Sequence, residues 1–177
     1  MLSNKEREWF LILTLDEKES LESLIDPCFI KKYLGSQEFI RGEERFCLWI
    51  TSENKNLAYN TPAIKERIDG VYKMRVSSKK AATVKDAERP HEFSEIRYQP
   101  TDAIIVPAVS SERREYIPIG FVDKDTVISN SAFAVYDAEL WLFGMLTSKM
   151  HNVWVRAVGG ALETRIRYSA TLCYNTF

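Results

Sequence analysis

The stretch GGALETRIRYS, residues 159–169, carries a charged side chain at every second position from Glu163 to Arg167. Successive side chains of a β-strand point to opposite faces, so the spacing predicts a strand with Glu163, Arg165 and Arg167 on one face. A DNA groove offers partners for these groups, because arginine suits the paired acceptors of guanine and glutamate accepts from the amino group of cytosine. The alternative is a solvated face with internal Glu–Arg pairing, which spacing alone favours because charge runs are usually soluble surface.

The composition is that of a globular protein with no excess of either charge. The 177 residues suffice for one domain with a real core, and 45% are hydrophobic and 28% charged. With 24 basic and 25 acidic residues the net charge is −1, so bulk electrostatics do not indicate a nucleic-acid partner. Cys28, Cys47 and Cys173 are odd in number and widely spread, which argues against zinc and disulfides and for a reducing compartment.

No membrane or export signal is visible in the sequence. The chain opens without a signal peptide, and no apolar run approaches the length needed to span a bilayer. We therefore expect a cytoplasmic protein that makes no membrane contact.

Hydrophobic spacing and turn residues predict a chain that mixes helices and strands without regular βαβ alternation, which is the α+β class. In the first half we expect helices over 16–25 and around 29–34, strands over 37–40 and 45–51, a helix beginning at 60–62, and an exposed loop over 77–89. In the β-rich second half we expect strands over 103–109, 116–122 and 126–136, a helix over 138–150, and a helical continuation or second helix over 151–158 that Gly159 and Gly160 end.

Recognisable catalytic motifs are absent from the sequence. It contains no phosphate-binding glycine loop, no nucleophile elbow, no HExxH and no methyltransferase motif. His91 and His151 have no readable triad partners, and His151 is best interpreted as a helix-end or core histidine. Asp102, Asp125 and Glu163 could form a nuclease-like set, but such a set arises easily by chance among 25 acidic residues. We therefore expect no catalytic residue and no metal site in this chain.

Several sequence blocks, in this order, resemble one domain of a known enzyme family, the MmeI-like type IIL restriction–modification enzymes. The blocks are residues 33–40, 45–50, 106–118 and 141–151 with Trp154 and Arg156, and finally 167–169 and 174–177. They are similar to the target recognition domain of these enzymes. The resemblance therefore implies a single mixed α/β domain that recognises double-stranded DNA, with a helical lead-in over residues 1–34 and the recognition domain over 35–177.

The same resemblance implies a longer parent protein. Enzymes of this family join an endonuclease, which uses Mg²⁺, and an adenine-N6 methyltransferase, which uses S-adenosylmethionine, to the recognition domain. The catalytic motifs would then lie upstream, both ends of this chain would be cuts in a longer polypeptide, and this fragment would bind no cofactor itself. Its partners would be double-stranded DNA and the methyltransferase domain of the same chain.

The resemblance also assigns base-reading positions. Glu163 and Arg165 correspond to a pair that reads one base pair, while Arg167 reads another together with Asn130 or Ser131. Asn130 could pair with adenine through its amide, or it could simply satisfy a turn. Candidate phosphate contacts, each equally consistent with plain solvated surface, are Lys79, Lys80, Arg113, Arg114 and Lys149.

Two other interpretations of the whole chain remain open at this point. One is a protein-interaction or scaffolding domain without base contacts, which the net charge of −1 and the aromatic-rich segment around Trp141 favour. The other is a stand-alone nuclease built on the scattered carboxylates. Trp141, Phe143, Trp154 and Tyr168 are expected in the core rather than as base-stacking platforms, because aromatic residues at helical spacing among aliphatic ones are usually buried.

Overall fold

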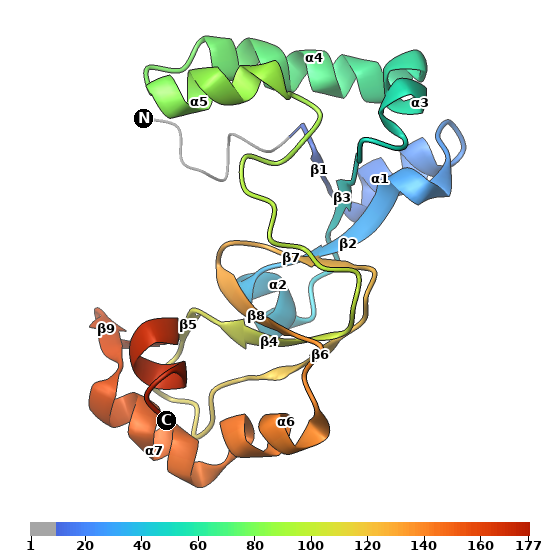
Figure 1. Cartoon of the computed structure of the whole chain (residues 1–177). Helices are drawn as coiled ribbons and strands as arrows, with labels where there is room; N and C mark the ends of the chain where they lie inside the picture. The colour runs from blue at the N-terminus through green and yellow to red at the C-terminus, as the bar shows by residue number, and fades with distance from the viewer. Residues whose placement is uncertain (1–9) are drawn as a thin grey trace. The chain divides into compact units, whose positions relative to one another are not determined.

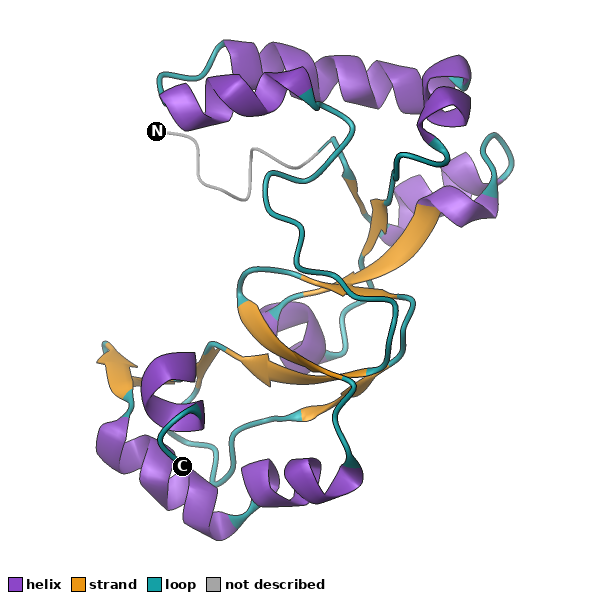
Figure 2. Cartoon of the chain, in the orientation of Figure 1, coloured by secondary structure: helices purple, strands orange, loops and turns teal. Residues whose placement is uncertain are grey.

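The computed structural model describes residues 10–177, which form two compact units (Figure 1). The first unit contains the described residues up to Lys32 together with Glu44–Arg97. The second contains Tyr33–Glu43 and Tyr98–Phe177. Both units combine helices with short antiparallel strands (Figure 2), which confirms the predicted α+β class. No helix among residues 10–177 is long and apolar enough to cross a membrane.

The first unit begins with a small antiparallel sheet. Strand β3 (Phe46–Leu48) pairs on one side with β1 (Ile12–Leu13) and on the other with β2 (Ile30–Leu34), whose last two residues belong to the second unit. Helix α1 (Leu15–Glu22) begins at Thr14, which forms a capping box with Glu17. A single 3₁₀ turn, η2 (Pro27–Phe29), leads into β2.

The helices α3 (Lys55–Asn60), α4 (Pro62–Val76) and α5 (Ala81–Lys85) complete the first unit, followed by the 3₁₀ turn η3 (Asp86–Glu88). Helix α4 has Pro62 in its first turn, as the sequence predicts, because a missing N–H costs nothing there. Its buried residues Ile64, Ile68, Val71 and Arg75 recur at helical spacing and face the core.

A three-stranded antiparallel sheet forms the centre of the second unit. Strand β4 (Ala103–Pro107) is buried along its whole length between β6 (Gly120–Val122) and β8 (Ala132–Tyr136). Strand β7 (Thr126–Ile128) precedes β8, and helix α2 (Ser36–Arg41) lies beside β4 (Figure 1).

A second small sheet and three helical segments complete the second unit. Strand β10 (Arg165–Arg167) pairs with both β5 (Val109–Ser110) and β9 (Gly160–Leu162). Helices α6 (Leu140–Thr147) and α7 (Lys149–Val158) and the π-helical turn η4 (Ala170–Tyr174) cover the core. That core consists of Ile104, Val106, Ile117, Leu146, Val155, Tyr168 and Cys173.

Three predicted elements of the first half are wrong. Residues 29–34 form a 3₁₀ turn and strand β2 rather than a helix. Residues 37–40 lie in helix α2 rather than a strand, because the Glu38 carboxylate accepts the Gly35 backbone N–H at 3.1 Å and so caps a helix. The predicted loop over 77–89 contains α5 and η3.

The predicted helix over 138–150 is interrupted at Ser148. This residue has extended backbone angles, and its hydroxyl accepts the His151 N–H at 3.1 Å, so it ends α6 and caps α7. The second of the two alternatives for residues 151–158, a separate helix, is therefore correct. The predicted boundary at residue 34 stays a prediction, and residues 1–9 of that lead-in lie outside the described part of the chain.

Candidate nucleic-acid interface

The charged stretch at residues 159–169 is a β-hairpin rather than one strand. Strand β9 pairs with β10, with Arg165 opposite Leu162 and Arg167 opposite Gly160, and residues 163 and 164 form the turn. Glu163 adopts a left-handed φ of 59°, which takes it out of the strand. The expectation that all three charges share one strand face is thus wrong for Glu163. It holds for Arg165 and Arg167, which lie two residues apart on β10.

Arg165 and Glu163 form the internal pair that the sequence left as an alternative. The Arg165 guanidinium donates to the Glu163 carboxylate at 2.8 Å, and the two side chains are 46% and 77% exposed. Ion pairs this exposed contribute only about 0.2–1 kcal/mol, so the pair orients Arg165 without fixing it. Arg167 is also exposed and has no ion pair within residues 10–177.

Asn130 and Ser131 lie in the turn between β7 and β8, and their side chains differ in availability. The Ser131 hydroxyl accepts the Ser36 backbone N–H at 2.9 Å and bonds the Ser129 hydroxyl at 2.8 Å. Asn130 is exposed, and its side chain makes no hydrogen bond to another residue of the described chain. Of the two alternatives for the partner of Arg167, the geometry therefore leaves Asn130 free to contact a ligand.

The backbone of Ala108 connects this turn to the end of strand β10. The Ala108 carbonyl accepts the Tyr168 N–H at 2.9 Å, directly after Arg167, and the Ala108 N–H donates to the Ser131 carbonyl at 3.1 Å. The structure thus brings Arg167 and Asn130, 37 positions apart in the sequence, to two elements anchored on the same residue.

The candidate phosphate contacts fall in both units. Lys79 and Lys80 lie in the first unit, just before α5, and both are exposed. Arg113 and Arg114 follow β5 in an exposed turn of the second unit, and β5 pairs directly with β10. Lys149 opens helix α7.

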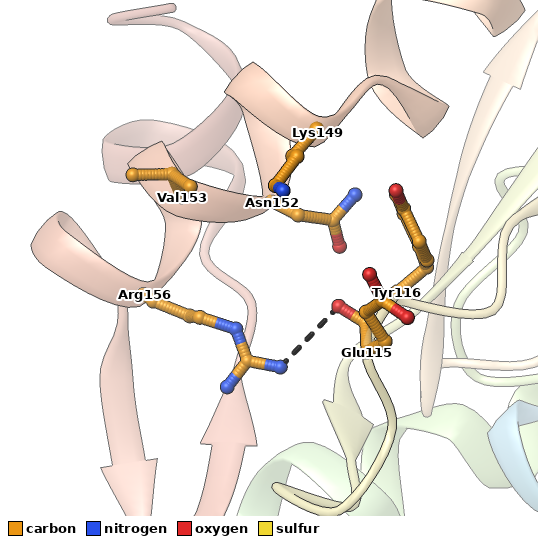
Figure 3. Close-up of a pocket in the computed structure, with 6 residues that line it drawn as sticks. All are labelled: Glu115, Tyr116, Lys149, Asn152, Val153 and Arg156. Atoms are coloured by element: carbon orange, nitrogen blue, oxygen red, sulfur yellow. Dashed lines mark hydrogen bonds between the residues drawn. The ribbon is translucent and has the colours of Figure 1, made fainter.

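Arg156 is a cation that the sequence did not single out as a contact. Its guanidinium donates to the Arg114 carbonyl at 2.6 Å and to the Glu115 carbonyl at 3.4 Å. These two hydrogen bonds connect the turn that contains Arg113 and Arg114 to helix α7. Arg156 and Glu115 border a cavity of about 240 Å³, which Figure 3 shows. The lining residues are Glu115, Tyr116, Lys149, Asn152, Val153 and Arg156. The sequence contains a signal for this grouping, because Lys149 and Arg156 are separated by about two helical turns and therefore lie on the same face of α7.

His151 is a core histidine, in line with its interpretation from the sequence. It is fully buried, and its Nε2 lies 3.0 Å from the Tyr168 hydroxyl. Phe177 packs edge-on against its ring. Burial lowers the pKa of His151 below its ordinary 6.5 and raises the pKa of Tyr168. Both side chains are uncharged at pH 7. Their contact holds Tyr168, which directly follows β10, in the core of the second unit.

We expect acidification to destabilise the second unit through His151. Its pKa is lowered on folding, so below about pH 6.5 the unfolded chain binds more protons than the folded one. Stability is complete above that pH and falls with a slope of up to about 1.4 kcal/mol per pH unit until the folded pKa is reached. Urea unfolding at pH 7.5 and 5.5 measures this loss, which His151→Gln should reduce. Equal stability of the wild type at both pH values would contradict the assignment.

The aromatic predictions divide into two groups. Tyr168 is buried and Phe143 packs against the core, as expected, and Trp154 is half-buried on α7. Trp141 is 61% exposed on α6, so the prediction of a core position is wrong for it. Its indole N–H donates to Glu139 at 3.0 Å rather than packing inward. Residues 10–177 contain no group of three or more His, Cys, Asp or Glu side chains placed to hold a metal ion.

The fold and surface place exposed basic side chains on the β9–β10 hairpin and on the turn that follows β5, which is the kind of surface a DNA-contacting module presents. The chain belongs to the MmeI target recognition domain family, whose model matches residues 3–177. It is 45% identical over 149 residues, 84% of this chain, to DNA methyltransferase A of Bacillus subtilis (strain 168), of which it spans 17%. The predicted family resemblance is therefore confirmed.

A solved structure agrees with this membership. The type IIL restriction–modification enzyme MmeI, determined in complex with DNA, superimposes with a TM-score of 0.89 at 38% identity. The match covers 95% of this chain and 23% of that one. The chain therefore spans about a fifth of the length of the relatives it matches.

Proposed function

We propose that this chain reads the DNA target of a longer bacterial enzyme and directs a fused adenine-N6 methyltransferase and endonuclease to that site. The recognition region is residues 35–177. The parent uses S-adenosylmethionine for methylation and Mg²⁺ for cleavage in the cytoplasm, while this segment contributes sequence recognition and no chemistry. Membership in the MmeI target recognition domain family is the observation on which the proposal depends. The chain covers only about a fifth of each relative, which supports a longer parent protein.

The hairpin β9–β10 is the reading element in this proposal. A two-stranded ribbon fits the major groove of B-DNA, where each base pair presents a distinct pattern of donors and acceptors. Arg165, with Glu163, reads one base pair, and Arg167, with Asn130, reads another. A good base contact discriminates by about 1–3 kcal/mol, which exceeds the 0.2–1 kcal/mol of the exposed Arg165–Glu163 pair. Arg165 therefore exchanges its internal partner for a base at little cost.

The near-neutral charge of the chain is compatible with DNA binding. A module tethered to a methyltransferase need not neutralise all phosphates itself, because the neighbouring domain shares that task. Arg113 and Arg114, in the turn next to β10, are the basic side chains best placed for phosphates beside the read bases. Lys79, Lys80 and Lys149 are further proposed contacts.

The exposed apolar surface of α6 supports a protein partner in addition to DNA. Leu140, Trp141 and Met145 are 77%, 61% and 43% exposed on a helix made almost wholly of apolar residues. A helix that is apolar on all sides is normally buried. We assign this surface to the methyltransferase domain of the same parent chain, so the scaffolding interpretation describes one side of the module and not its whole function.

Replacing Arg113 by alanine in the parent enzyme should weaken duplex binding about equally for all sequences. The reason is that a phosphate contact releases counterions without reading bases, so the slope of log K against log salt should become shallower by about 1. Titrations of a cognate and a scrambled duplex between 50 and 200 mM salt measure both effects. Arg41→Ala, which removes an exposed cation paired to Glu43 in the same unit, is the matched control and should leave the slope unchanged. Binding that is independent of salt would overturn the DNA-reading proposal and favour a scaffold.

A further inference from the structure

Ala108 is the single residue between β4 and β5, and its backbone groups connect two distant segments. Its carbonyl accepts the Tyr168 N–H at 2.9 Å at the end of β10. Its N–H donates to the Ser131 carbonyl and to the Ser36 hydroxyl, each at 3.1 Å. The position of the turn at residues 129–131 relative to Arg167 is thus defined through Ala108.

Ser36 is the residue that closes this arrangement. It is only 8% exposed, and it makes three contacts with two different segments. Its backbone N–H donates to the Ser131 hydroxyl at 2.9 Å, and its own hydroxyl donates to the Ser131 carbonyl while accepting from Ala108. The Ser36 side chain therefore satisfies the N–H donor of Ala108 and the carbonyl acceptor of Ser131, which are 72 and 95 residues away.

Gly35 makes the close approach possible. A Cβ at this position would lie 2.3 Å from the Ser131 hydroxyl oxygen, 2.5 Å from that of Ser129 and 2.8 Å from a Glu38 carboxylate oxygen. Real Cβ atoms do not approach other heavy atoms so closely, so any other residue would force these hydroxyl and carboxylate groups out of their present positions. Glu38, 8% exposed, accepts the Gly35 N–H and holds this end of α2 in place.

We propose that Ser36 is a positioning residue for DNA reading, because it sets where Asn130 stands relative to Arg167. The inference rests on the proposed function, in which Asn130 and Arg167 read one base pair together. Ser36 itself lies inside the fold and touches no base. It acts through the 129–131 turn, which bears Asn130 at its exposed tip.

The expected consequence of losing the Ser36 hydroxyl is confined to one base pair. Hydrogen bonds to base edges require about 2.7–3.2 Å between heavy atoms. If the 129–131 turn becomes more mobile, Asn130 holds this distance less well and distinguishes the correct base pair from others less strongly. The fold itself persists, because the Ala108 N–H keeps the Ser131 carbonyl and β10 keeps its pairing with β5. Glu163 lies in the hairpin turn and Arg165 at the start of β10, and the hydrogen bond between them does not involve Ser36.

The test is Ser36→Ala in the full-length enzyme, with methylation rates measured on the cognate duplex and on duplexes with each single base-pair change. Arg167→Ala, measured in parallel, identifies the base pair that the arginine reads. At that pair Ser36→Ala should reduce discrimination about tenfold, and discrimination at all other pairs should remain at wild-type values. Ser131→Ala, which removes the partner hydroxyl instead, should reproduce the pattern if Ser36→Ala folds poorly.

The matched control is Thr147→Val, which deletes a half-buried hydroxyl that donates to the Phe143 carbonyl at 2.8 Å in the same unit. It should lower stability slightly and leave selectivity unchanged. Full discrimination in both serine variants, while Arg167→Ala loses it, would overturn the role of Ser36 and spare the proposed function. An equal loss at every base pair would show a merely structural role. No effect of Arg167→Ala would overturn the proposed function itself.

Discussion

Arg167→Ala in the full-length enzyme is expected to relax the choice of base at one position of the recognition site by a factor of about ten to a hundred. The factor corresponds to the roughly 1–3 kcal/mol that a good arginine–guanine contact contributes to discrimination. Arg167 is exposed on β10 and has no ion pair within the described chain, so its loss removes no internal support. Methylation rates on the cognate duplex and its three variants at each position give the result directly.

Arg165→Ala is the matched comparison, since Arg165 lies two residues away on the same strand face. It should relax a different base pair and leave the one read by Arg167 intact. If Arg167→Ala methylates the same set of sites with unchanged selectivity, the assignment of Arg167 is wrong. If both variants weaken binding evenly on all sequences, the two arginines contact phosphates and the hairpin is not the reading element.

The largest effect on stability is expected for Arg75→Met in the first unit. Arg75 is 1% exposed, and its guanidinium donates to the backbone carbonyls of Asp86, Arg89 and Glu92 at 2.9, 2.8 and 2.7 Å. Methionine fills a similar volume but donates nothing, so three carbonyls of a compact loop lose a charged donor. We expect a loss of about 3 kcal/mol, because hydrogen bonds to charged groups contribute about 1.5–3 kcal/mol each and are only partly replaced by water.

Hydrogen exchange of the α4 amides measures this loss locally, without assuming that the two units unfold together. Lys73→Met is the control, since Lys73 lies on the same helix but is exposed. It should change protection by less than about 0.5 kcal/mol. Equal protection in the two variants would mean that Arg75 packs as a hydrocarbon stem and that its hydrogen bonds contribute little.

Elements with a local signal were predictable from the sequence. Helix α4 follows from Pro62 and the apolar spacing of Ile64, Ile68 and Val71. The buried strand β4 follows from its continuous run of β-branched residues. Helix α2 was mistaken for a strand because it is only six residues long and its decisive cap, between Glu38 and the Gly35 backbone, carries no side-chain hydroxyl at the cap position.

The candidate site was predictable where it depends on spacing and not where it depends on tertiary contacts. The two-residue interval correctly predicted a shared face for Arg165 and Arg167 on β10. It misplaced Glu163, because neither Glu163 nor Thr164 is a typical hairpin-turn residue and the turn is determined by pairing of β9 with β10. The contacts of Ser36 with Ala108 and Ser131 join segments far apart in sequence, so no local pattern could reveal them.

A structure of the parent enzyme bound to its own DNA site tests the central claim most directly. The quantity to measure is the distance from the guanidinium nitrogens of Arg165 and Arg167 to the nearest atoms on base edges. We predict hydrogen-bonding distances, about 2.7–3.2 Å, to two different base pairs, with the β9–β10 hairpin in the groove. A hairpin that faces solvent, or arginines that reach only phosphates, would contradict the account.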